Sequence, residues 1–134
     1  MNHQVIWKVL FLCSSLLSPD LSAREHLLEG EQTYRKVCAT CHEKGVANAP
    51  RVGHVDHWKP LIGEGQVKLT AHGFVGVRGM PPRGGSAQLP LKSFASALVY
   101  MVNQSGGHWQ SPDDVTLNLI EQEIKVRRTA LKAP

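Results

Sequence analysis

The sequence predicts an all-α fold, with three to four helices in one small domain followed by an extra C-terminal helix. Two observations favour it: apolar residues recur at helical spacing in several stretches, and the alternating pattern of strands is nearly absent. Clusters of glycine and proline separate these stretches, as connecting loops do. With 134 residues, the chain is long enough for one domain and little more.

Three helices are expected before residue 106. Residues 27–37 place apolar side chains near one face, and residues 66–75 form a second helix that Gly76 ends. Residues 91–102 form the third helix, which again has an apolar face.

Two segments between these helices are expected to be loops. Residues 45–65 are punctuated by glycine and proline, and they leave room for at most a helical turn around Trp58. The segment from Gly79 to Gly85 also contains two prolines, and this composition excludes a helix and a central strand.

Residues 107–134 are predicted to form a tail separate from a domain of residues 24–106. Ser111 is a favourable N-cap, and Pro112 suits the first helical position. The helix that follows carries one apolar stripe, made of Val115, Leu119, Ile120, Ile124 and Leu131. We expect this stripe to dock on a partner or on a second copy; packing back onto the domain is an equal alternative.

Residues 1–23 have the pattern of an export signal. Lys8 precedes an apolar run at residues 9–17, and Leu21-Ser22-Ala23 provides a small-residue cleavage site. The run is about half of the ~20 residues that a membrane-spanning helix needs, so an uncleaved anchor is the weaker interpretation. Cys13 would leave with this signal, and no cysteine would then be left for a structural disulfide beside the pair described next.

Cys38-Ala39-Thr40-Cys41-His42 is a CxxCH motif, the attachment signature of haem c. Thiols one helical turn apart can add across the two vinyl groups of one haem, and His42 then reaches the iron through Nε2. A thioredoxin-like redox pair would need a strand before the motif, and a zinc site would need a fourth ligand; a chance match is the third alternative. We predict one covalent haem c, which would also stabilise a small core.

Met80 is predicted to bind the iron from the other side. It lies in a rigid loop, and a thioether ligand gives low-spin iron with a raised reduction potential. The alternatives are a gap-filling core role for Met80, and His72 or His54 as a second histidine ligand. Met101 lies in the middle of a predicted helix and is expected in the core.

Two further residues are candidates for haem contacts. The carbonyl of Pro50 could accept the Nδ1–H of His42 and so orient the ring, or Pro50 could be an ordinary turn proline. Trp58 is expected to be buried against the haem, with its indole N–H donating to a propionate; plain packing is the alternative.

Taken together, these motifs resemble the class I c-type cytochromes and, within them, the bacterial cytochrome c₅ group. The resemblance covers about residues 29–103. Besides CxxCH it rests on Tyr34, Gly45, Ala49-Pro50-Arg51-Val52-Gly53, Trp58, Gly79-Met80-Pro81-Pro82-Arg83-Gly84-Gly85, Ala97 and Tyr100-Met101-Val102. It implies a cytochrome c-like domain wrapped around one haem, His42 and Met80 as axial ligands, and the bond from His42 to Pro50. It also implies that the helix with Gly30 and Tyr34 packs across the helix with Tyr100.

The chain departs from this group in two places. Many members carry a cysteine pair after the Gly-Gly, whereas this chain continues with Ser86-Ala87-Gln88. The tail after Gly107 also lies outside the pattern.

The resemblance implies a periplasmic carrier of single electrons between redox proteins, and not an enzyme. The net charge of +4, without a long basic run, predicts no nucleic-acid binding and a mild preference for acidic partner surfaces. We expect a monomer or weak dimer, with peripheral association with membrane respiratory complexes as one mode of action. The alternative is a fixed haem subunit of a larger respiratory oxidoreductase complex, docked through the C-terminal helix. A peroxidase, a reductase or a gas sensor would need an open sixth position on the iron, which the rigid Met80 loop disfavours.

Overall fold

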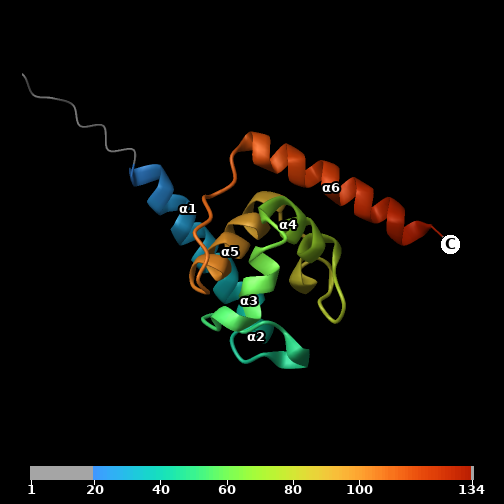
Figure 1. The fold of residues 1–134 in the computed structure, drawn as a ribbon. Coiled ribbons are helices and arrows are strands. Elements are labelled where there is room, and N and C mark those ends of the chain that lie inside the picture. The colour runs from blue at the N-terminus through green and yellow to red at the C-terminus, as the bar shows by residue number, and fades with distance from the viewer. Residues whose placement is uncertain (1–19, 134) are drawn as a thin grey trace, which may run out of the picture.

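The computed structural model describes residues 20–133, which fold into helices joined by loops, with no strand among them (Figure 1). The helices are α1 (Asp20–Thr33), α2 (Ala39–His42), α3 (Val55–Ile62), α4 (Gln66–Val75), α5 (Leu91–Asn103) and α6 (Asp114–Lys132). A π-helical turn, η1 (Tyr34–Cys38), and two 3₁₀ turns, η2 (Val46–Asn48) and η3 (Pro82–Gly85), lie between them. The predicted all-α class is confirmed.

The export signal predicted for residues 1–23 falls mostly on residues 1–19, outside the described part of the chain. It therefore stays a prediction. Among residues 20–133, no helix combines the length and the apolar character needed to cross a membrane.

The first predicted helix is longer than expected. α1 runs without a break through η1 into α2, so the CxxCH motif lies within helical backbone. The π-helical turn adds one residue to a turn, and such turns are frequent at functional sites. Here it ends at Cys38, at the start of the motif.

α1 and α5 cross in close contact, as the family resemblance implies. A Cβ atom at Gly30 would lie only 2.4 Å from the carbonyl oxygen of Ser96, so only glycine allows this approach. One turn further on, the rings of Tyr34 and Tyr100 pack with their centroids 5.2 Å apart. This crossing fixes the helix that leads into the CxxCH motif.

Residues 45–65 contain more helix than predicted. α3 is an eight-residue helix, although Pro60 lies inside it. Trp58, on the same helix, is only 2% exposed and packs into the core beside Cys38 and Met101. The free energy of burying this large side chain outweighs the cost of the internal proline, which composition alone suggested would prevent a helix.

The helices predicted at residues 66–75 and 91–102 are observed as α4 and α5. α4 is bounded by Gly65 and Gly76, both with positive φ angles that favour glycine. The predicted irregular segment around Met80 holds only the short turn η3, whose inner residues have non-helical backbone angles.

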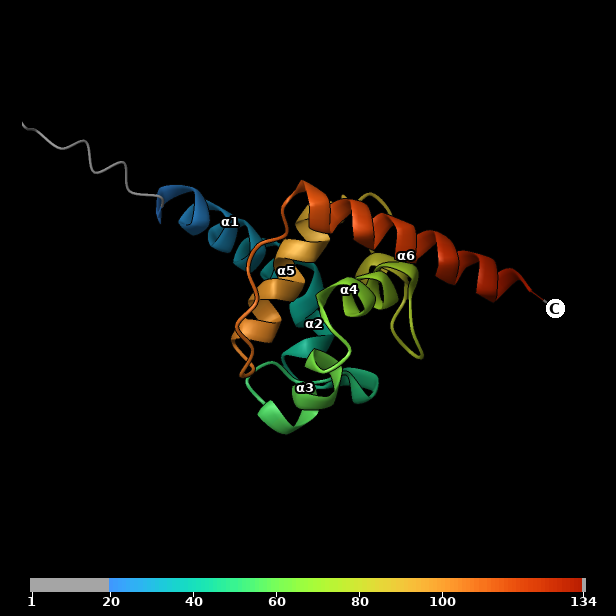
Figure 2. The same cartoon turned by 45° about the horizontal axis from the view of Figure 1, so that its top comes forward.

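The C-terminal tail packs back onto the domain. α6 lies across α4 in both views, and its C-terminal end reaches past the rest of the fold (Figures 1 and 2). Ile120 is 0% exposed and Ile124 5% exposed, and both pack with Phe74 and Phe94 in a second core cluster. The expectation that the whole apolar stripe docks elsewhere is therefore wrong, because its central residues are already buried.

Two further features of α6 differ from the prediction: the exposure of the outer residues of the apolar stripe, and the residue that caps the helix. Val115, Leu119 and Leu131 remain exposed. The N-cap is Asp113, not Ser111, since its side chain accepts the backbone N–H of Thr116 at 2.8 Å. The domain boundary predicted after residue 106 stays a prediction.

Candidate functional site

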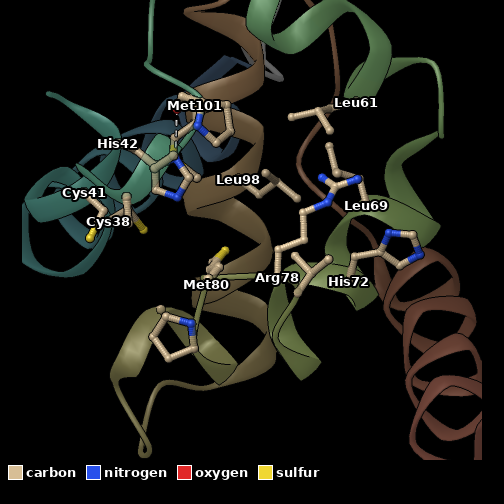
Figure 3. Close-up of a pocket in the computed structure, with 18 of the residues that line it drawn as sticks. Cys38, Cys41, His42, Leu61, Leu69, His72, Arg78, Met80, Leu98 and Met101 are labelled. Carbon is tan, nitrogen blue, oxygen red and sulfur yellow. Dashed lines mark hydrogen bonds between the residues drawn. The ribbon is translucent and has the colours of Figure 1, made fainter. Parts of the chain in front are cut away.

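The CxxCH residues lie at one end of a cavity of about 640 Å³. Figure 3 shows the side chains of Cys38, Cys41 and His42 together at this end, with Met80 facing them. Cys38 and His42 are 4% and 7% exposed, because the packing of η1 and α2 against α5 and Trp58 covers them. The cavity volume lies in the range of sites for bound cofactors.

His42 is oriented by the loop that follows it. Its Nδ1 lies 2.9 Å from the carbonyl oxygen of Pro50. A carbonyl oxygen only accepts, so Nδ1 must carry the proton and Nε2 keeps its lone pair for a metal. The backbone N–H of Val52 donates to the carbonyl of His42 at 2.9 Å and holds the loop in place. The structure thus forms the predicted contact between His42 and Pro50.

Met80 is held by a tight turn of its own. The backbones of Val77 and Met80 exchange two hydrogen bonds, of 3.1 and 2.9 Å. Arg78, inside the turn, adopts a positive φ of 52°, and two prolines follow Met80. The thioether is therefore presented to the cavity by a constrained backbone, opposite the His42 ring (Figure 3).

The walls of the cavity are mainly apolar. They come from the helices α3, α4 and α5 and from the turn η1. The apolar residues include Val37, Leu61, Leu69, Phe94, Leu98 and Met101. Met101 is 2% exposed and also belongs to the first core cluster, as predicted for a core residue. An apolar site of this kind excludes water from a bound planar group.

Trp58 does not have the predicted free indole N–H. Its Nε1 donates to the carbonyl of Arg51 at 2.9 Å, which leaves no donor for a haem propionate. Trp58 lines the cavity and packs beside His42, with ring centroids 6.1 Å apart. Its observed role is thus to fix the loop with Pro50 and to fill space.

The other histidines lie in different settings. His72 lines the cavity, and its Nδ1 lies 2.9 Å from a carboxylate oxygen of Glu64. His54 and His57 stack on each other at the surface, with ring centroids 5.1 Å apart. His54 is not among the residues that line the cavity.

The Cys38 thiol does not have the character of a thioredoxin-like nucleophile. Burial raises the pKa of the Cys38 thiol to about 11. A thioredoxin-like pair instead depends on a lowered thiol pKa. The helix before the motif, in place of a strand, points the same way.

The charged end of the cavity was not predicted from the sequence. Arg78, Glu64 and Arg127 line it together with His72. Arg78 stands two positions before Met80 and could have been suspected from that spacing. Arg127 gives no such signal, because its place depends on how α6 packs on α4.

These residues fit a covalent haem c. The mainly apolar cavity is lined by two thiols one helical turn apart, by a histidine whose Nε2 is available, and by a thioether that faces the histidine. The donor set is that of a haem with nitrogen and sulfur ligands.

Comparison with known proteins agrees with this geometry. A family model described as "Cytochrome C oxidase, cbb3-type, subunit III" matches residues 25–101. Cytochrome c-555 of Chlorobaculum tepidum is 41% identical over 80 residues, which are 57% of this chain and 74% of the relative. Cytochrome c5 of Azotobacter vinelandii is 37% identical over 71 residues, which are 52% of this chain and 86% of the relative.

A solved structure is similar as well. It is described as an electron transfer complex of nitrite reductase with cytochrome c, and the matching chain is 39% identical with a TM-score of 0.55. The match covers 57% of this chain and 94% of that one. The chain therefore belongs to the c-type cytochromes, as its motifs suggested, and it carries a covalently bound haem c.

Proposed function

We propose that this monohaem cytochrome carries single electrons in the periplasm between redox proteins, with His42 and Met80 as the axial ligands of its iron. The observation that carries the proposal is that these two side chains face each other across one cavity (Figure 3). The bound haem supplies the ferric–ferrous couple. A constrained ligand pair favours transfer over catalysis, because catalysis at the iron needs an open position.

The protein residues act mainly by holding the ligands and excluding water. The Pro50 carbonyl fixes the His42 ring and its tautomer, and a hydrogen bond of this kind raises the basicity of the ligand. The turn at Val77 and Met80 limits the movement of the thioether. Leu69 and Leu98 line the cavity and keep it dry, which favours the less charged ferrous state.

Export and partner binding are supported by separate features. The apolar run in residues 9–17 favours export. Val46, Ala47 and Gly79 line the cavity and are exposed, so a partner could approach the haem there. Lys44, two positions before Val46, is also exposed and suits an acidic partner surface. That the similar solved chain lies in an electron transfer complex with nitrite reductase supports a redox protein as the partner class.

A second function has one observation in its favour. Val115, Leu119 and Val126 share the outer face of α6 and are 67%, 47% and 63% exposed. A fixed subunit of a larger respiratory complex could bury this strip, which a free carrier would leave in water.

The ligand pair is tested by the spectrum of the oxidised protein. The wild type should show the weak sulfur-to-iron charge-transfer band and a high reduction potential. Met80→Ala should remove the band and lower the potential, since a thioether favours ferrous iron. Met101→Leu is the matched control, because it removes a second sulfur from the cavity wall with little change of volume. A band that survives in the Met80 variant, or is lost in the Met101 variant, would overturn the assignment.

A further inference from the structure

The extra C-terminal helix brings a cation to the haem cavity. Arg127 lies one helical turn after Ile124 and two after Ile120, so it shares the face that these buried residues hold against α4. Arg127 is accordingly among the residues that line the cavity. It lies beyond residues 25–101, the part that the family model matches.

One nitrogen of Arg127 lacks a partner. Within residues 20–133, its Nε is buried and makes no hydrogen bond. A buried donor on a charged group is costly when it is left without an acceptor, and native proteins almost always satisfy such groups. The position of Arg127 therefore calls for an acceptor inside the cavity.

Two carboxylates, Glu64 and Glu123, lie near this place, and neither accepts the Nε–H of Arg127. Arg78 also extends into the cavity (Figure 3), and Arg127 lines the cavity from a different element. Glu64 is the one carboxylate among the lining residues, and it is already engaged, 2.9 Å from Nδ1 of His72. Burial and the neighbouring Arg127 lower the pKa of His72, whereas Glu64 and Glu123 act to raise it.

The chemistry of haem matches this arrangement. The macrocycle carries its two vinyl groups and its two propionates at opposite edges. Cys38 and Cys41, which take the vinyl edge, lie at the other end of the cavity from His72 and the Arg78 guanidinium (Figure 3). The propionates thus belong at the end where the cations gather, and carboxylates form strong hydrogen bonds with guanidinium groups.

We propose that Arg127 donates its Nε–H to a haem propionate, so that α6 closes the cavity and helps to set the reduction potential. The proposal deepens the function given above, because it requires the haem of this carrier to lie in that cavity. A cation held near the haem favours the ferrous state, which carries one positive charge fewer than the ferric state. The helix α6 then contributes a residue to the haem site, in addition to any role in binding a partner.

The test compares the reduction potentials of three variants of the holoprotein. Arg127→Gln removes the charge, Arg127→Lys keeps it, and Arg128→Gln removes an exposed charge from the same turn of α6. At a fixed applied potential, Arg127→Gln should lower the ratio of ferrous to ferric protein about three- to tenfold, where tenfold corresponds to about 59 mV. Arg127→Lys should restore most of the ratio, and Arg128→Gln should leave it nearly unchanged.

Infrared difference spectra between the two redox states give a second readout. The propionate carboxylate bands should shift in Arg127→Gln and stay in place in Arg128→Gln. Equal potentials and equal propionate bands in these two variants would overturn the proposal. The sulfur-to-iron band of the wild type is the separate check on the ligand assignment. Absence of this band would refute Met80 as a ligand, but the comparison of the Arg127 variants would remain valid.

Discussion

Replacing Ile120 by alanine tests whether α6 is part of the folded domain. Ile120 is 0% exposed and packs with Ala71, Phe74 and Phe94 under the helix. Truncating a fully buried isoleucine removes its transfer free energy and leaves a cavity, at a cost of about 2–5 kcal/mol. We therefore expect Ile120→Ala to lower the free energy of unfolding by at least about 2 kcal/mol and the melting temperature by about 10 °C.

The assay is urea unfolding of the holoprotein, followed by far-UV circular dichroism and by the haem absorption band. Val115→Ala is the control, because Val115 is 67% exposed on the same helix and its truncation should change stability by less than about 0.5 kcal/mol. Both probes should report one transition, at a lower urea concentration for Ile120→Ala. Equal midpoints for the two variants would refute the packing of α6 on α4.

Three other substitutions test the packing and hydrogen bonds around the site. Gly30→Ala should destabilise the protein by about 1–3 kcal/mol, because the new Cβ would meet a carbonyl oxygen of α5 at 2.4 Å. Replacing glycine by alanine at a solvent-exposed helix position normally raises stability, so a gain in thermal stability would contradict this contact. The hydrogen bond from Thr116 holds the pKa of Asp113 below its usual value of 3.8, so the stability it provides is present above that pH and is lost as pH falls through the lowered value. The urea midpoint of the wild type should therefore fall relative to Asp113→Asn on acidification below 3.8, and parallel pH profiles would be evidence against this cap. Trp58→Phe should cost about 1–3 kcal/mol, since the Arg51 carbonyl loses its buried donor, and an unchanged urea midpoint would count against that bond.

The sequence predicted the local parts of the site better than its long-range parts. Helical periodicity located α4 and α5, and the CxxCH spacing placed two thiols and a histidine on one turn, since such features depend on near neighbours along the chain. The contact between His42 and Pro50 spans only eight positions and could be anticipated.

Features that depend on tertiary packing could not be read in the same way. Composition predicted a loop where α3 forms, because a pattern of glycines and prolines does not reveal how much free energy the burial of Trp58 provides. The apolar stripe of α6 indicated a buried face, but not what covers it. The position of Arg127 at the cavity depends on that packing, so it could not be predicted from the sequence either.

X-ray absorption at the iron edge would show whether His42 and Met80 bind the haem iron from opposite sides of the cavity. We expect one sulfur atom in the first coordination shell of the iron in the wild type, and none in Met80→Ala. The thioether sulfurs of Cys38 and Cys41 attach to the macrocycle and would not contribute to that shell. A shell of nitrogen and oxygen atoms alone in the wild type would show that Met80 does not bind the iron.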